Sequence, residues 1–296
     1  MVLSIPLDII IWLQSFQDVA VFNALMNFVS LLGEEYFYIV VLGMIYWVVS
    51  KRFGEYLGIT LGTSITLNNT LKEIFNLPRP FQEYPNQVDN LREYTATGSA
   101  FPSGHVQGSS SLFFAIYFYL KKRMFLIAAI IITVLMMISR MYLGVHYIQD
   151  VIFGAFIGVS VACANYYFFK RFKDNDRLLH RYYLILILLF LPGFILIQGN
   201  DFFKGYGILV GLVFGIMLEK RFVSFSLIIP WAKRIIRLVL GLVLMAGTLI
   251  IVKEIFGVFN ATEGGFIYNL LDFIRYFLVA FVGFGLYPML FTKLKF

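Results

Sequence analysis

The chain of 296 residues has few charged side chains and a single cysteine. Asp, Glu, Lys and Arg make up 14% of it, against about a quarter in an ordinary soluble domain. This shortage excludes a typical soluble globular protein. The lone Cys163 excludes an intramolecular disulfide. The N-terminus lacks the basic region and the small-residue cleavage site of a signal peptide, so we expect no removable signal.

Hydrophobic residues, in contrast, are abundant. They form 60% of the chain, and the mean hydropathy is +0.81. They are arranged in runs of about 17–25 residues, the length that crosses a hydrocarbon core of about 30 Å. The 33 Phe and 18 Tyr suit lipid-facing and interfacial positions. The sequence therefore predicts an all-α fold, a polytopic transmembrane helical bundle.

The hydrophobic runs predict about nine spans. They lie near residues 36–50, 54–75, 104–120, 124–140, 148–169, 182–198, 205–219, 235–252 and 267–290. Lys and Arg gather at alternate ends of these runs, which by the positive-inside rule places the N-terminus outside and the C-terminus in the cytoplasm. We thus expect an integral protein of the cell membrane. Because the net charge of +7 comes from such span ends, we expect no nucleic-acid partner.

The chain divides into three expected regions. Residues 1–34 are apolar but interrupted by polar side chains, a pattern typical of amphipathic helices at the membrane interface; a tilted span from Val19 to Leu32 is the alternative. Residues 35–170 form a core, and residues 180–296 add four further spans. In that extension Gly207, Gly211 and Gly215 have helical i, i+4 spacing, which fits either close intramolecular helix packing or a dimer interface. The oligomeric state is left open.

Three polar stretches interrupt the core at the ends of hydrophobic runs, and all three fall on the predicted outer side. The last contains Ser139-Arg140, His146 and Asp150. His146 and Asp150 are four residues apart, so they share a helix face. A carboxylate there can hold one ring nitrogen of the imidazole and leave the other as a nucleophile or base.

The other two stretches carry groups that bind phosphate. Pro102-Ser103-Gly104-His105 predicts a turn that opens a helix, where backbone N–H groups and a hydroxyl can receive an anion. Lys72 and Arg79 lie at the outer end of an earlier span, and they offer a point charge and a planar bidentate donor. Ionisable groups are costly in a membrane, so this concentration of them indicates function.

Together the stretches Lys72-x6-Arg79-Pro80, Pro102-Ser103-Gly104-His105 and Ser139-Arg140-x5-His146-x3-Asp150 resemble the complete signature of the type 2 phosphatidic acid phosphatase (PAP2) superfamily. The resemblance covers about half of the chain. It implies a metal-independent hydrolase of phosphoric esters or anhydrides, with no cofactor.

The resemblance also implies a role for each residue. His146 would be the nucleophile that forms a phosphohistidine, Asp150 would orient it, and His105 would protonate the leaving group. The phosphate would be bound by five residues, namely Lys72, Arg79, Ser103, Gly104 and Arg140.

These motifs do not identify the substrate. We expect a lipid phosphate or diphosphate at the outer leaflet, such as a polyprenyl diphosphate, phosphatidic acid or phosphatidylglycerol phosphate, because a site beside membrane helices admits a lipid laterally. The nine-span outline is similar to that of glucose-6-phosphatase, so a soluble sugar phosphate is an alternative. A non-catalytic lipid-binding or transport protein on the same fold is another.

Overall fold

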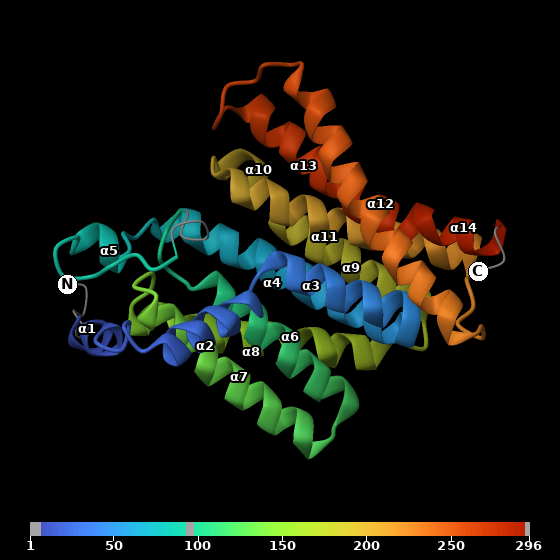
Figure 1. Cartoon of the computed structure of the whole chain (residues 1–296). Helices are drawn as coiled ribbons and strands as arrows, with labels where there is room; N and C mark the ends of the chain where they lie inside the picture. Colours follow the sequence, from blue (N-terminus) through green and yellow to red (C-terminus); the bar gives the residue numbers. More distant parts are fainter. Residues whose placement is uncertain (1–6, 93–97, 294–296) are drawn as a thin grey trace. The chain divides into compact units, whose positions relative to one another are not determined.

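The computed structural model describes residues 7–92 and 98–293, and every regular element in these ranges is a helix (Figure 1). The all-α prediction is confirmed. Helical elements cover most of each segment predicted as a span. Because the chain is largely apolar, its backbone polar groups must be satisfied within each segment, and a helix does this in lipid.

The described residues contain six helical stretches long and apolar enough to cross a membrane. They are Arg123–Tyr142, Ile148–Phe172, Asp176–Leu196, Asn200–Val223, Trp231–Gly257 and Phe266–Phe291. A seventh arises if the pair Ala20–Leu31 and Glu35–Val49, bent by 57°, is one broken span. The predicted count of nine is not confirmed by length and composition, and it stays a prediction, as do the three region boundaries.

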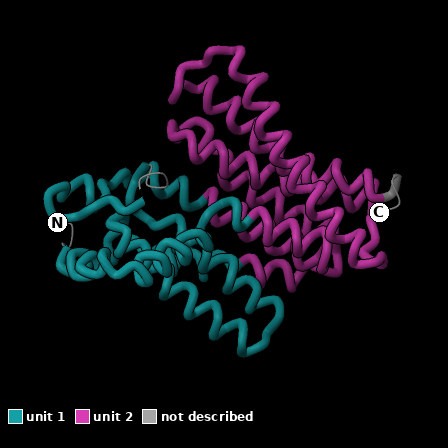
Figure 2. Tube along the Cα trace, in the orientation of Figure 1, with its two compact units in different colours: residues 1–38, 67–164 teal, residues 39–66, 165–296 magenta. Residues whose placement is uncertain are grey.

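The helices belong to two compact units (Figure 2). Unit 1 comprises residues 1–38 and 67–164, and unit 2 comprises residues 39–66 and 165–296. Five helices lie wholly in unit 1: α1 (Asp8–Gln14), α2 (Ala20–Leu31), α5 (Pro80–Glu83), α6 (Gly104–Leu120) and α7 (Arg123–Tyr142). Three contribute residues to both units: α3 (Glu35–Met44), α4 (Lys51–Phe75) and α8 (Ile148–Phe172).

The core of unit 1 joins the two N-terminal helices to α7. Leu13 of α1, Met26 of α2 and Met136 of α7 are buried in one hydrophobic cluster. Ser139 of α7 also donates a hydrogen bond to the carbonyl oxygen of Met26 over 2.7 Å. The N-terminal segment is therefore packed into unit 1 as two helices, and its position relative to a membrane stays a prediction.

Unit 2 holds the remaining elements. They are η1 (Ile45–Val49), α9 (Asp176–Phe190), α10 (Gly193–Leu196), α11 (Asn200–Leu218), η3 (Glu219–Val223), α12 (Trp231–Gly257), α13 (Phe266–Phe281), η4 (Val282–Leu286) and α14 (Tyr287–Lys293). The glycine ridge of α11 packs against α13: a Cβ added at Gly207 would lie 2.5 Å from the Phe273 carbonyl oxygen, and one at Gly211 would lie 2.4 Å from that of Phe277. The predicted intramolecular packing of this ridge is confirmed.

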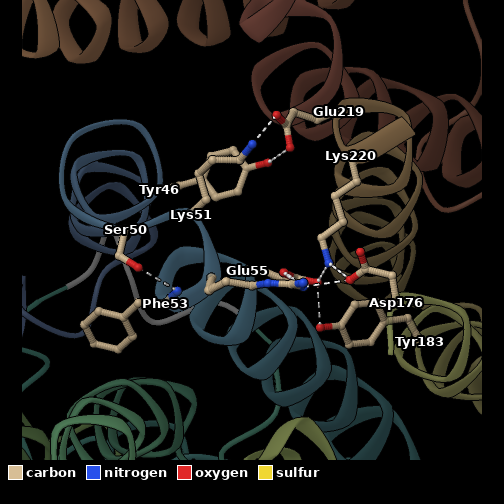
Figure 3. A network of polar contacts seen from close by, with 10 residues as sticks. Tyr46, Ser50, Lys51, Phe53, Glu55, Asp176, Tyr183, Glu219 and Lys220 are labelled. Carbon is tan, nitrogen blue, oxygen red and sulfur yellow. Dashed lines mark hydrogen bonds and ion pairs between the residues drawn. The ribbon is translucent and has the colours of Figure 1, made fainter. Parts of the chain in front are cut away.

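Unit 2 also contains a network of paired charges (Figure 3). Glu55, 1% exposed, accepts hydrogen bonds from Lys220 at 2.5 Å, Tyr183 at 3.1 Å and Arg52 at 3.2 Å. Arg52 and Lys220 also pair with Asp176, at 2.9 and 3.0 Å.

A second carboxylate of this network, Glu219, is fully buried. It pairs with Lys51 at 2.5 Å and accepts the backbone N–H of Phe225 at 3.0 Å. The charged side chains around both carboxylates line a pocket with a volume of about 230 Å³. Three cations and three carboxylates therefore balance one another within unit 2.

Candidate active site

All eight residues predicted to form the site lie in unit 1, where five elements position them. Lys72 is in the last turn of α4, and Arg79 is the N-cap of α5. Ser103 is the N-cap of α6, whose first residues are Gly104 and His105. Arg140 lies in the last turn of α7, His146 lies in the segment that follows, and Asp150 lies in the first turn of α8.

Arg79 fastens the loop after α4 to the turn that carries His146. Its side chain is 1% exposed. Nε donates to the carbonyl oxygen of Gly98 at 3.0 Å, and one terminal nitrogen donates to that of Val145 at 3.2 Å. Burial lowers the pKa of Arg79 to about 10, against the opposing charge of Asp150. The guanidinium therefore remains cationic near neutral pH.

The turn before α6 is held against α8. The backbone N–H of Ser103 donates to the carbonyl oxygen of Asp150 at 3.0 Å. A Cβ added at Gly154 of α8 would lie 2.8 Å from the carbonyl oxygen of Ser103, so only glycine permits this approach. The second and third polar stretches are thus in direct contact.

The end of α4 reaches the same turn. A Cβ added at Gly104 would lie 3.0 Å from Asn68 Oδ1 and 3.9 Å from Lys72 Cε. The Asn68 amide donates to Gln107 Oε1 at 2.9 Å and to the Pro102 carbonyl oxygen at 3.2 Å. Asn68 therefore holds the Ser103–His105 turn beside Lys72.

Arg140 is fully buried, and Ser30 of α2 holds one end of its guanidinium. A terminal nitrogen of Arg140 donates to Ser30 Oγ at 2.6 Å. Its Nε and its other terminal nitrogen have no hydrogen-bond partner in the described part of the chain. Sequence reasoning missed Ser30, because no spacing rule connects residues 110 positions apart.

The turn between α7 and α8 depends on Gly144. This residue has a φ of +73°, and a Cβ there would lie 2.2 Å from the carbonyl oxygen of Asp89. Both the backbone conformation and the space therefore require glycine. The amide of Gln14, another residue that sequence reasoning missed, donates to the carbonyl oxygens of Asp89 and Tyr142 at 2.8 and 3.1 Å.

His146 and Asp150 face each other at ion-pair distance, but His146 lies in the turn before α8 and not on a shared helix face as predicted. His146 Nδ1 lies 3.6 Å from Asp150 Oδ2, too far for a hydrogen bond. The same carboxylate oxygen accepts the backbone N–H of Tyr147 at 2.8 Å. Asp150 therefore fixes the turn through Tyr147.

The imidazole of His146 is held neutral by its surroundings. Burial lowers the pKa of His146 well below its usual range, and the nearby cations Arg79, Arg140 and Lys72 lower it further. A neutral imidazole keeps a lone pair on one ring nitrogen, which a nucleophile or a general base requires.

Several buried polar atoms of this site have no hydrogen-bond partner among the described residues. They are Ser103 Oγ, His105 Nε2, Nε and one terminal nitrogen of Arg140, and His146 Nδ1. Buried donors without partners are costly. Their gathering beside Arg79 and Lys72 suits a tetrahedral oxyanion, which would accept several of them at once.

The described part of the chain shows no cluster of three or more His, Cys, Asp or Glu side chains suited to a metal ion. The expectation that the chemistry needs no metal stays a prediction.

Comparison with known families identifies two consecutive parts. Residues 54–174 match the PAP2 superfamily, and residues 203–296 match the transmembrane extension of PAP2 superfamily phosphatases. The first match contains all eight predicted site residues.

Two curated proteins are similar to the chain. It is 29% identical to a probable sphingosine-1-phosphate phosphatase of Dictyostelium discoideum over 162 residues, which cover 49% of this chain and 38% of the relative. It is 26% identical to the dihydrosphingosine 1-phosphate phosphatase YSR3 of Saccharomyces cerevisiae over 141 residues, 45% of this chain and 35% of the relative. The chain thus matches less than two fifths of either relative's length. No solved structure gives a significant match.

Proposed function

Because the chain belongs to the PAP2 superfamily and carries its transmembrane extension, we propose that it is an integral membrane phosphatase acting on a lipid phosphate. The observation that carries this proposal is the group of partnerless donors on Ser103, His105 and Arg140. A phosphoryl group is the ligand that such a set accommodates, since phosphoryl transfer demands chiefly positioning and cancellation of charge.

In the first step a ring nitrogen of neutral His146 attacks phosphorus. A bond forms from nitrogen to phosphorus, and the bond from phosphorus to the substrate oxygen breaks. The leaving oxygen takes a proton from the imidazolium form of His105, which the negative charge of the bound phosphoryl group stabilises, and His105 becomes neutral. Asp150, 3.6 Å from His146 Nδ1, stabilises the positive charge that develops on the ring, and this charge shortens the contact.

In the second step water attacks the phosphohistidine. The water loses a proton to His105, the phosphorus–nitrogen bond breaks, and inorganic phosphate leaves. Arg140, Arg79 and Lys72 neutralise the equatorial oxygens in both steps, while the hydroxyl of Ser103 and the backbone at Gly104 donate hydrogen bonds.

The relatives favour a phosphorylated long-chain base as the first substrate to test, because both are named as phosphatases of such lipids. Phosphatidic acid, phosphatidylglycerol phosphate and a polyprenyl diphosphate carry the same reactive group. The positive-inside distribution of Lys and Arg in the loops supports a site on the non-cytoplasmic side and a C-terminus in the cytoplasm. Membrane lipids surround the helices.

The test is phosphate release by the full chain in detergent from a panel of these four lipids and glucose 6-phosphate, with EDTA present. His146→Ala provides the blank. We expect release from at least one lipid and a much lower rate from glucose 6-phosphate. Preference for the sugar phosphate would support the soluble-substrate alternative. Lipid binding without any release would support a non-catalytic protein, and loss of release in EDTA would contradict a metal-independent mechanism.

A further inference from the structure

The break between α2 and α3 lies against the proposed active site. The two helical stretches, Ala20–Leu31 and Glu35–Val49, bend by 57° at this break. Irregular backbone in a membrane protein is tolerated where it is buried in protein or lines a cavity. Residues 30–34, which we call the break segment, precede residue 54, where the PAP2 superfamily match begins.

Ser30 is the first of three contacts between the break segment and the site. Both Ser30 and Arg140 are fully buried, and the hydroxyl of Ser30 accepts the 2.6 Å hydrogen bond from the Arg140 guanidinium. This bond holds one terminal nitrogen of the guanidinium in place. It leaves Nε and one terminal nitrogen directed elsewhere, without partners in the described ranges.

Gly33 is the second contact. A Cβ at this position would lie 2.9 Å from both Cβ and Cδ2 of His105, and 3.0 Å from Cε of Met136. Real Cβ atoms do not come so near to other carbon atoms, so any larger residue would displace the ring of His105. The backbone of the break segment therefore forms the wall against which His105 rests.

Glu34 is the third contact. It pairs with Arg92 in the loop between α5 and α6, and Arg92 also donates to Asn27 Oδ1 at 3.0 Å. This pair joins the loop between α5 and α6 to the break segment.

We propose that the break segment is part of the active site, with Ser30 and Gly33 as positioning residues for Arg140 and His105. This inference rests on the proposed phosphatase function. Ser30 sets the direction of the guanidinium donors toward the phosphoryl oxygens. Gly33 sets the place of the imidazole that protonates the leaving oxygen.

The experiment compares the full chain with Ser30→Ala and Gly33→Ala in detergent. Matched controls are Ser109→Ala, a buried serine that bonds within its own helix, and Gly247→Ala, where a Cβ meets no atom within 4 Å. Two quantities are measured: kcat and KM on the best lipid phosphate of the panel, and the affinity for inorganic phosphate from its effect on the thermal unfolding midpoint.

For Ser30→Ala we expect kcat to fall about 10-fold to 100-fold, because a hydrogen bond to a charged group is lost, and phosphate to bind several-fold more weakly. In an Arg140→Lys background the same change should cost no more than about 2-fold, since Ser30 acts through Arg140. For Gly33→Ala we expect kcat to fall about 10-fold or more, with a smaller loss of phosphate affinity than in Ser30→Ala.

If Ser30→Ala does not fold, the isosteric pair Ser30→Thr and Ser30→Val replaces it, and only the threonine variant should retain activity and phosphate affinity. Equal kcat and phosphate affinity in Ser30→Ala and Ser109→Ala would overturn the inference. A wild type that binds phosphate but hydrolyses nothing would refute the proposed function alone, because the effect of Ser30 on phosphate affinity would still be measured.

Discussion

The charge network around Glu55 and Glu219 in unit 2 and the predicted site in unit 1 both contain buried charged side chains, but these side chains are satisfied differently. In unit 2 the carboxylates Glu55 and Glu219 each accept at least two hydrogen bonds, and Arg52, Lys51 and Lys220 pair with them. In unit 1 the buried donors of Ser103, His105 and Arg140 have no partner among the described residues. A network of paired charges stabilises the fold, whereas an excess of buried hydrogen-bond donors favours the binding of an anion.

The largest effect is expected when one histidine of each unit is replaced by alanine and the two variants are compared. His146→Ala should lower phosphate release about 10⁴-fold or more, because it removes the nucleophile. His180→Ala, a half-buried histidine of unit 2, should leave release within about 2-fold. Both rates are measured per folded molecule on the same lipid phosphate. Comparable losses in the two variants would refute the assignment of the site to unit 1.

The next largest effect on kcat is expected when one buried arginine of each unit is replaced by alanine. Arg140→Ala should lower kcat about 10²-fold to 10³-fold, as expected for the loss of donors that stabilise transition-state charge. Arg237, 2% exposed in unit 2, donates to the carbonyl oxygen of Ser226 at 2.8 Å. Arg237→Ala should lower the thermal unfolding midpoint without changing kcat. A loss of kcat in the Arg237 variant as large as in the Arg140 variant would show that both arginines act through general stability.

The paired network of unit 2 should respond in stability alone. Glu219→Gln leaves Lys51 facing a neutral amide and should cost roughly 2 kcal/mol of unfolding free energy. Glu254→Gln, an exposed residue of α12, is the control and should change little. The check is the unfolding midpoint together with kcat of the surviving folded protein. A kcat reduced in Glu219→Gln would contradict a purely stabilising role.

The smallest effect concerns pH. Burial and neighbouring cations hold the pKa of His146 well below its unfolded value, so the unfolded state binds more protons than the folded state below about pH 6.5. The stability that depends on neutral His146 is therefore fully present above about pH 6.5. It decreases as the pH falls below that value toward the lower pKa of the folded state. Between pH 7.5 and 5.5 the loss should reach about 1 kcal/mol.

Unfolding midpoints of wild type and His146→Asn across this pH range would reveal that loss, since the variant should be less sensitive to acid. Equal sensitivity would mean that His146 is not held neutral in the folded protein.

The sequence allowed prediction of much of the fold and of the site. Hydrophobic runs predicted the helices, and three polar stretches predicted one composite site, whose residues the structure brings together in unit 1. Ser30 and Gln14 escaped prediction, since each meets its partner across more than 70 residues of chain. Lys51 and Lys220 were interpreted only as basic ends of spans, because spacing along a helix does not reveal pairing with Glu219 or Glu55.

The central claim is that His146 takes the phosphoryl group, and a covalent intermediate tests it most directly. The full chain is mixed with a lipid carrying labelled phosphate, quenched rapidly in alkali and analysed for label on the protein. We predict an acid-labile, alkali-stable label on a peptide containing residue 146, present in wild type and His180→Ala and absent from His146→Ala. Label that persists in His146→Ala, or turnover by that variant at the wild-type rate, would contradict the claim.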